Sequence, residues 1–264
     1  MRHTGTIERG ACLGGRERGF ALAELLAVLI MLIAIGAVIG AFMPDARRRS
    51  QMSGSLTNLQ RLGAAAADYG MENADSVFSF TWRASAMGQR CDNGDDTYTF
   101  PPASTDLQAA ANQAICILRR QGRRDIQQIT GWIPHIQYNH LALADYLGEQ
   151  LPSRLFVSPG DRFRLEWQDA LTRNPANPRQ GFFDLTCRPF GNSNNESRWP
   201  YSSSYEMPPA FFSPDAAMNG VQTIGQGPDS HRTYTIGSQS MPLGRRILSE
   251  IRHPSQKAMM FETN

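Results

Sequence analysis

The sequence lacks the short motifs that mark the common catalytic, metal and nucleotide sites. It contains no H-E-x-x-H, no paired C-x-x-C, no P-loop, no G-x-S-x-G elbow and no G-x-G-x-x-G after a candidate strand. His135 and His140 are five residues apart, which misses the i, i+4 spacing that places two metal ligands on one helix face. We therefore expect that the protein is not an enzyme and holds no cofactor.

A strong net charge, internal repeats and lysine are also missing. The 26 basic residues, of which Lys257 is the only lysine, nearly balance 24 acidic ones, and the net charge is +2. This balance favours neither a nucleic-acid partner nor an acidic one. Because no repeat is present at any period typical of solenoids or propellers, we expect one ordinary domain after the N-terminal part.

Cysteine is scarce. Cys12 precedes the long apolar segment described below, and Cys91, Cys116 and Cys187 follow it. Three cysteines allow at most one intrachain disulfide in an oxidising compartment, and their spacing does not say which two pair.

Long apolar runs are absent except for one. From Phe20 to Met43 the chain has 24 residues whose only charge is Glu24, and Pro44 closes the run. A helix of this length reaches roughly 36 Å, which crosses the hydrocarbon core of a bilayer. A secretory signal peptide has an apolar core of only about 7–15 residues, with the cleavage site behind it. The run therefore predicts a membrane helix. A carboxylate near the centre of such a helix costs on the order of 2.5–3.5 kcal/mol and usually marks a function, and Glu24 lies one turn inside its start.

The start of this run resembles the N-terminal segment of type IV prepilins and type II secretion pseudopilins. In that family a short basic leader ends in glycine, the mature chain begins with phenylalanine, and its fifth residue is glutamate. Here these residues are Gly19, Phe20 and Glu24. The resemblance covers about the first 50 residues, and its one departure is Pro44, which lies three residues later than the family's usual proline.

The resemblance implies a structural function. A prepilin peptidase would cut between Gly19 and Phe20, which removes Cys12, and would methylate the new amine of Phe20. Glu24 would act in assembly, as subunits join one another and other pilin-like subunits in a type II secretion pseudopilus or a type IV pilus-like fibre. A plain signal anchor is the alternative for this segment, but it leaves Glu24 unexplained.

Arginine residues lie on both sides of the run, so their count alone gives no orientation. The leader carries Arg2, Arg9, Arg16 and Arg18, and Arg47, Arg48 and Arg49 follow the run. The resemblance places the chain in the inner membrane as a single pass, with the leader cytoplasmic and the head periplasmic or in a fibre. The second arginine group either binds anionic headgroups or is a solvated helix turn.

The expected fold class is α+β and pilin-like, a long N-terminal transmembrane helix with a loop-rich globular head that contains a mostly antiparallel sheet. The parts are a leader, the transmembrane and periplasmic parts of the long helix, and the head, over residues 1–19, 20–43, 44–72 and 73–264. Gly36 and Gly40 form a G-x-x-x-G that allows close packing of membrane helices, although glycine is also frequent in such helices.

Beyond Pro44 apolar residues recur at helical spacing, at Met52, Leu56, Leu59, Ala66 and Tyr69. The far half of this face is expected to pack on the protein's own sheet. Gly70, followed by Asn73 and Asp75, is the expected stop.

Two further helices are expected in the head. Thr105 and Gln108 form a capping box that predicts a helix over about 106–120, ending near Gly122. Cys116 lies at its apolar face, which predicts a buried thiol. A short helix from Asn139 to Leu147 is expected to be capped by Asn139 and stopped by Gly148.

Alternating apolar residues predict a half-buried strand over 77–83. Short apolar runs between Pro, Gly, Asn and Ser give further strand candidates, over 155–157, 163–167, 182–185, 233–236 and 258–261. The last of these is expected at a sheet edge, unless the chain is a fragment.

Two charged clusters are weak site candidates. Asp92, Asp95 and Asp96 lie in an expected loop over 89–102, but their spacing matches no EF-hand, so no metal site is expected. A basic cluster lacks interleaved aromatic residues, and we interpret it as a solvated helix end rather than a DNA or lipid site; it comprises Arg119, Arg120, Arg123 and Arg124.

A second function is a membrane-tethered periplasmic binding module that uses the pilin-like segment only as an anchor, and a third is an anchored enzyme. An aromatic-lined groove would favour the binding module, and the candidates for it are Trp132, Trp167, Trp199 and Tyr201. The sequence does not distinguish secretion from pilus use, or a major from a minor subunit.

Overall fold

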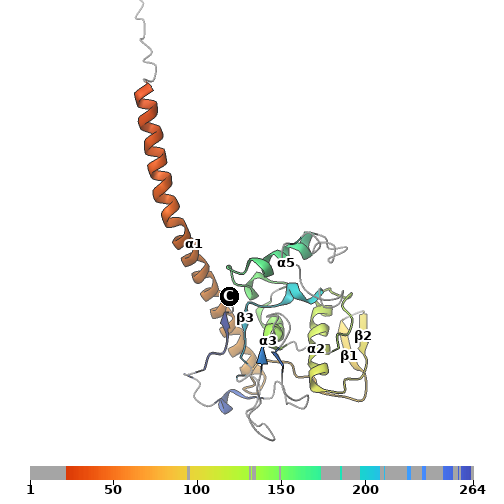
Figure 1. Ribbon diagram of the computed structural model, residues 1–264. Helices are drawn as coiled ribbons and strands as arrows, with labels where there is room; N and C mark the ends of the chain where they lie inside the picture. Colours follow the sequence, from red (N-terminus) through yellow and green to blue (C-terminus); the bar gives the residue numbers. More distant parts are fainter. Residues whose placement is uncertain are drawn as a thin grey trace, which may run out of the picture. The chain divides into compact units, whose positions relative to one another are not determined.

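The computed structural model describes residues 22–93, 96–130, 132, 135–148, 150–173, 185, 197–208, 211, 225–226, 234–235, 246–251, 255 and 257–262. The chain divides into two compact units, Met1–Arg48 and Arg49–Asn264, which are described separately. Its fold class is α+β, with one long apolar N-terminal helix, several short helices and small antiparallel strand pairs (Figure 1).

Helix α1 runs from Leu22 to Glu72 and includes Pro44. It ends just before Ala74 and Asp75, which adopt left-handed backbone conformations with φ of 51° and 60°. The backbone amide of Asn73 donates to the carbonyl of Tyr69 at 2.9 Å, which closes the last turn. The expected stop is confirmed, because α1 ends at Glu72, directly before Asn73 and Asp75, although Gly70 itself is still helical and is buried.

The part of α1 in the second unit buries one face. Leu62, Ala65, Ala66 and Tyr69 belong to the hydrophobic core. Met52 and Leu56, in the near half of the predicted face, are 64% and 58% exposed, and only the far half was expected to pack on the head. The buried position in this turn of the helix is taken by Ser55, a polar residue held by a hydrogen bond.

A hairpin and a helix follow. Strands β1 (Gln89–Asn93) and β2 (Asp96–Phe100) pair antiparallel, so the expected loop over 89–102 is wrong. Helix α2 spans Asp106–Arg120, as predicted, and Thr105 Oγ1 accepts from the backbone amide of Gln108 at 3.2 Å. Only this half of the capping box forms, because the Gln108 side chain instead donates to Asn112 and to the carbonyl of Ile129. Gly122, with φ of 97°, follows the helix.

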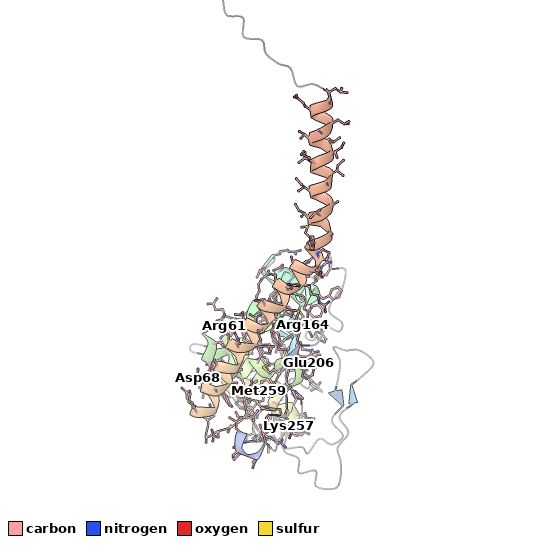
Figure 2. The ribbon with its side chains drawn as sticks, turned by 90° about the vertical axis from the view of Figure 1, so that its left-hand side faces the viewer. Arg61, Asp68, Arg164, Glu206, Lys257 and Met259 are labelled. Atoms are coloured by element: carbon pink, nitrogen blue, oxygen red, sulfur yellow. A yellow bond between two sulfur atoms is a disulfide. The ribbon has the colours of Figure 1, made fainter. Side chains whose placement is uncertain are left out.

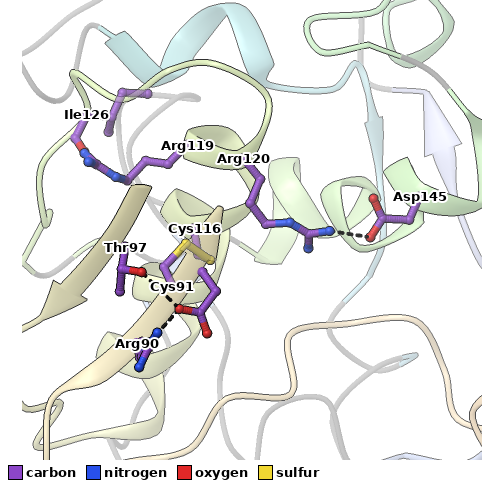
Figure 3. Close-up of a disulfide and its surroundings, with 9 residues drawn as sticks. Arg90, Cys91, Thr97, Cys116, Arg119, Arg120, Ile126 and Asp145 are labelled. Atoms are coloured by element: carbon purple, nitrogen blue, oxygen red, sulfur yellow. Dashed lines mark hydrogen bonds and ion pairs between the residues drawn. A yellow bond between two sulfur atoms is a disulfide. The ribbon is translucent and has the colours of Figure 1, made fainter. Parts of the chain in front are cut away.

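A disulfide between Cys91 and Cys116 joins β1 to α2 (Figure 3). The prediction of a buried thiol at Cys116 is wrong in its chemistry, since the residue is buried but oxidised. Cys12 and Cys187 lie outside the described residues.

Short helical segments continue the chain as α3 (His135–Tyr138), η1 (Asn139–Leu143) and α4 (Ala144–Leu147). The predicted stop is confirmed, because Gly148 caps α4 with φ of 61°. The predicted cap is wrong, since the helical run already begins at His135 and the Asn139 side chain donates to the sulfur of Met207.

Residues 77–83 form no strand, although Phe78 and Phe80 are buried as the alternation suggested. The backbone amides of Thr81 and Trp82 donate to Gln113 Oε1 on α2, at 2.6 and 2.8 Å. A side chain thus takes the hydrogen bonds that a neighbouring strand would supply.

Two more strand candidates are helical. Residues 155–157 overlap η2 (Arg154–Phe156), and residues 163–167 lie in α5 (Arg162–Arg173). The prediction of a strand at 163–167 is wrong because two polar residues, Arg164 and Gln168, lie on the buried face of α5. They share this face with Trp167 and Leu171 at helical spacing.

The remaining segments are short. They are η4 (Trp199–Tyr201), β3 (Tyr205–Glu206), β4 (Gly225–Gln226), β5 (Tyr234–Thr235), η5 (Leu248–Glu250) and β6 (Phe261–Glu262). Strand β5 falls in the candidate over 233–236, whereas residues 258–260 are not in a strand and β6 begins at Phe261. Within the described residues β6 pairs only with β3, at a sheet edge as expected. Residues 182–184 lie outside the described residues, and Leu185 is not in a strand.

Candidate membrane span and assembly residues

Large apolar side chains cover all sides of α1 over residues 22–43. Each of the Leu, Ile, Val, Met and Phe side chains in this segment is between 50% and 85% exposed. So large an apolar surface requires lipid or another protein to cover it. Among the described residues, α1 is the one helix long and apolar enough to cross a membrane.

Glu24 lies in the first described turn of α1 and is the only charged residue that this helix contains before Asp45. Gly19 and Phe20, the predicted cleavage and methylation positions, lie outside the described residues.

Gly36 and Gly40 lie in the open part of α1. A Cβ atom added at either glycine would meet nothing within 4 Å, so both positions are accessible to a second helix. Arg47, Arg48 and Arg49 are exposed in α1, as both interpretations of this group require.

A polar group that the sequence analysis missed joins α1 to the last strand. Ser55 Oγ on α1 donates to Glu262 Oε2 at 2.6 Å, and Ser158 Oγ donates to the other carboxylate oxygen of Glu262. We call these three residues the Glu262 clasp. No sequence pattern could find it, because Ser55 and Glu262 are 207 residues apart.

Asn58 and Tyr205 extend this polar group. Asn58 Nδ2 on α1 donates to the Tyr205 hydroxyl at 3.2 Å and to the carbonyl of Val157 at 3.3 Å. Burial raises the pKa of Tyr205, and the nearby charge of Glu262 raises it further. The hydroxyl of Tyr205 therefore stays protonated and neutral beside the carboxylate.

The aspartate cluster offers no complete metal site in the described structure. Asp92 accepts from Arg90 Nε at 2.5 Å and from Thr97 Oγ1 at 3.3 Å. Asp95 and the side chain of Asp96 lie outside the described residues. Where the chain is described, no group of three or more His, Cys, Asp or Glu side chains could hold a metal ion.

The basic cluster is not a solvated helix end, so that interpretation is wrong for two of its members. Arg119 is buried and donates to the carbonyls of Arg124 and Ile126, with its guanidinium 3.9 Å from the centre of the Tyr98 ring. Figure 3 shows Arg119 turned towards Ile126 and Arg120 towards Asp145 on α4, 3.7 Å away.

Arg123 is also buried, and it donates to both carboxylate oxygens of Asp125 at 2.8 Å and to the Tyr201 hydroxyl at 3.0 Å. The hydrogen bonds from Arg123 lower the pKa of Asp125. Burial raises the pKa of Tyr201 to about 12. The sequence could not show this because Tyr201 is 78 residues away from Arg123.

The four aromatic residues proposed for a groove are all buried, between 1% and 6% exposed. The Trp167 and Trp199 rings lie 5.8 Å apart in a small core of their own. Trp132 packs on Tyr138 in the main core. In the part of the chain that the structure describes, these four side chains therefore belong to the packed interior of the head.

His140 is a buried core residue. Its ring lies 4.3 Å from the Phe156 ring, and neither ring nitrogen has a well-formed hydrogen bond. Burial lowers the pKa of His140 to about 3, and the charge of Arg164 adds to this shift. His140 is therefore neutral at physiological pH. The side chain of His135 lies outside the described residues.

Comparison of the chain with protein-family models, with curated proteins and with solved structures found no match.

Proposed function

We propose that this protein is a structural subunit of a type II secretion pseudopilus or of a type IV pilus-like fibre. A prepilin peptidase removes the leader after Gly19 and methylates the amine of Phe20. The apolar part of α1 holds the subunit in the inner membrane, with the head in the periplasm, until it joins other subunits.

The observation that supports the proposal is the combination of two features in helix α1. Over residues 22–43 its apolar side chains are exposed on every side, and its only carboxylate lies in the first turn. A helix that serves only as an anchor needs no carboxylate at that place, where it costs free energy in lipid. A subunit that moves from lipid into a fibre core has a use for it.

That use follows from the charge of the new N-terminus. After cleavage the amine of Phe20 is positively charged, and an unpaired charge in an apolar fibre core is costly. The Glu24 carboxylate offsets it, either within one chain or between neighbouring subunits. Between neighbours the pair would also fix the register, because a misplaced subunit would bury both charges unpaired.

The alternative is a membrane-tethered binding module. The aromatic groove that would favour it is replaced by buried tryptophans. A hollow of about 340 Å³ lined by Phe211, Lys257 and Phe261 is the feature that such a module would offer. Cross-linking separates the two, since a fibre subunit yields a ladder of self-multimers and a module yields one foreign partner.

The test of the proposal is Glu24→Ala, with Asp45→Ala as the matched control, since Asp45 is an exposed acidic residue on the same helix outside the apolar run. Processed monomer and sheared or cross-linked multimer are measured side by side. Glu24→Ala should be inserted and cleaved as the wild type but form no multimer, whereas Asp45→Ala should form both. Wild-type multimer yield from Glu24→Ala would contradict the assembly role.

A further inference from the structure

A hollow of about 580 Å³ lies between α1 and the segment 150–159 in the second unit. Asn58 and Arg61 line it from α1, on which Figure 2 labels Arg61. Arg154 and Pro159 line it from the segment that precedes α5. We call it the Arg61 hollow. Its volume lies within the range of sites that bind small ligands.

Contacts between α1 and the facing segment join the two walls of the Arg61 hollow. Gln51 Nε2 on α1 donates to the carbonyl of Pro159 at 3.4 Å, and Asn58 Nδ2 donates to the carbonyl of Val157 at 3.3 Å. A Cβ atom added at Gly54 would lie 3.0 Å from Pro159 Cγ, so the glycine lets the proline ring lie close against the helix backbone. The distance between the walls is therefore set by the fold.

The wall that carries Arg154 is held from behind. The Ser153 hydroxyl accepts from the backbone amide of Leu155 at 3.2 Å, and Gln168 Nε2 on α5 donates to the carbonyl of Ser153 at 3.2 Å. Ser153 and Leu155 are buried, whereas Arg154 between them is exposed. Because both walls are fixed, the hollow is formed before a ligand binds, and binding orders little of the chain.

The Arg61 hollow is locally basic, although the net charge of the whole chain is only +2. Among the described residues that line it, Arg61 and Arg154 are charged and none is acidic. Arg154 pairs with Asp169 on α5 at 2.6 Å, but these side chains are 67% and 43% exposed, and an ion pair so exposed contributes little. A ligand anion can therefore compete with Asp169 for Arg154.

The other lining groups indicate what kind of molecule carries the anion. Guanidinium groups bind carboxylates through paired hydrogen bonds. The exposed amide of Gln150 can donate to and accept from a peptide backbone, and Pro152 and Pro159 offer apolar rings beside it. A free inorganic anion would use the arginines and leave the amide and the rings without a contact.

We infer that the Arg61 hollow binds an acidic peptide segment of another protein. One carboxylate of the segment binds Arg61 on α1, a second binds Arg154 on the facing wall, and the peptide backbone lies beside Gln150. The site belongs wholly to the second unit. It does not rest on the proposed function, because a fibre subunit and a tethered module can both carry it.

The test measures the binding of dye-labelled peptides to the full chain in detergent micelles by fluorescence anisotropy. The probe is a short acetylated peptide of alternating Asp and Glu, and the same peptide with Asn and Gln is its control. The wild type should bind the acidic peptide about tenfold more tightly than the control. Arg61→Gln and Arg154→Gln should each weaken its binding by about tenfold, because a charge-assisted hydrogen bond is lost.

Matched variants on α5 distinguish this site from a general effect of charge. Arg162→Gln removes an exposed arginine that pairs with Glu166 at 3.6 Å and does not line the hollow, so it should bind as the wild type. Asp169→Asn removes the competitor for Arg154 and should tighten binding several-fold, whereas Glu166→Gln should not. A gain in affinity cannot result from misfolding.

The inference is overturned if the two peptides bind equally or if neither binds. Equal affinities of Arg61→Gln, Arg154→Gln and Arg162→Gln would contradict it, and so would an Asp169→Asn variant that binds no more tightly than Glu166→Gln. Inorganic phosphate is the last control. If phosphate displaces the peptide at an equal concentration, the site selects a small anion and the assignment to a peptide is wrong.

Discussion

Buried polar side chains set the positions of several helices in the head. Arg164 on α5 is buried, its Nε donates to Ser202 Oγ at 3.1 Å, and its guanidinium pairs with Asp161. Gln168, one turn later, donates to the carbonyls of Ser153 and Pro200. The N–H donors of both side chains are stable in the interior because carbonyl, hydroxyl and carboxylate oxygens replace water as their acceptors.

His140 should make the free energy of unfolding of the head decrease on acidification. This decrease should begin at a pH well above the range in which the carboxylates of the head titrate. The pKa of His140 is about 3 in the fold, against an ordinary 6.5. As pH falls below 6.5 the unfolded chain takes up a proton that the folded chain does not. The stabilisation is complete above pH 6.5 and is lost towards pH 3, at roughly 1 kcal/mol per pH unit.

The measurement is the urea concentration at the midpoint of unfolding, for the full chain in detergent micelles between pH 6.5 and pH 4.5. Tryptophan fluorescence reports the unfolding. Asp125 and Asp161 have pKa values lowered from 3.8, so their contributions are lost only at lower pH. His140→Leu, with His140→Gln as a second variant, should flatten the curve in this window. The same slope in wild type and both variants would refute the role of His140.

At the scale of elements, the Glu262 clasp should hold β6 to α1. Glu262→Ala leaves the Ser55 and Ser158 hydroxyls, 4% and 1% exposed, without their acceptor. An unsatisfied buried hydroxyl costs about 1–3 kcal/mol, so the free energy of unfolding should fall by about 2 kcal/mol. Asp68→Ala, at an exposed acidic residue on α1, is the control and should change it by less than about 0.5 kcal/mol.

A double-mutant cycle shows that the two residues act together. Because Ser55→Ala removes the hydroxyl that Glu262→Ala would leave unsatisfied, the double variant should lose less than the sum of the single losses, by about 1 kcal/mol. Strictly additive losses would mean that the contact between α1 and β6 does not contribute to stability.

The sequence correctly predicted the helices in which the apolar residues of the sequence are also the residues that the fold buries. In α2 the apolar residues Ala111, Ile115 and Leu118 are the buried ones, and Thr105 caps the helix through its own side chain. In α5 the apolar Phe163 is 50% exposed while the polar Arg164 is buried, so hydrophobic periodicity indicates the wrong element.

The burial of the basic cluster and the disulfide pairing could not be predicted from the sequence, because both depend on how the chain packs in three dimensions. Arg119 and Arg123 belong to a basic run in the sequence, yet carbonyls, Asp125 and Tyr201 enclose them in the fold. The pairing of Cys91 with Cys116 likewise depends on where β1 packs on α2, which spacing does not encode.

At the scale of the whole molecule, one part of α1 exposes a surface that water does not favour. Residues 22–43 expose apolar side chains all round, and such a surface requires lipid or another protein to cover it. The proposed fibre subunit would meet this requirement twice, first in the membrane and then among its own copies.

The identity of the mature N-terminus tests this account most directly. Protein purified from membranes is digested, and its N-terminal peptide is analysed by mass spectrometry, with a bulky substitution, Gly19→Trp, as the matched control. The account predicts a chain that begins at Phe20 with one methyl group on its amine, and a Gly19→Trp variant that keeps its leader. A wild-type chain that begins at Met1, or one cut behind the apolar run after Met43, would contradict it.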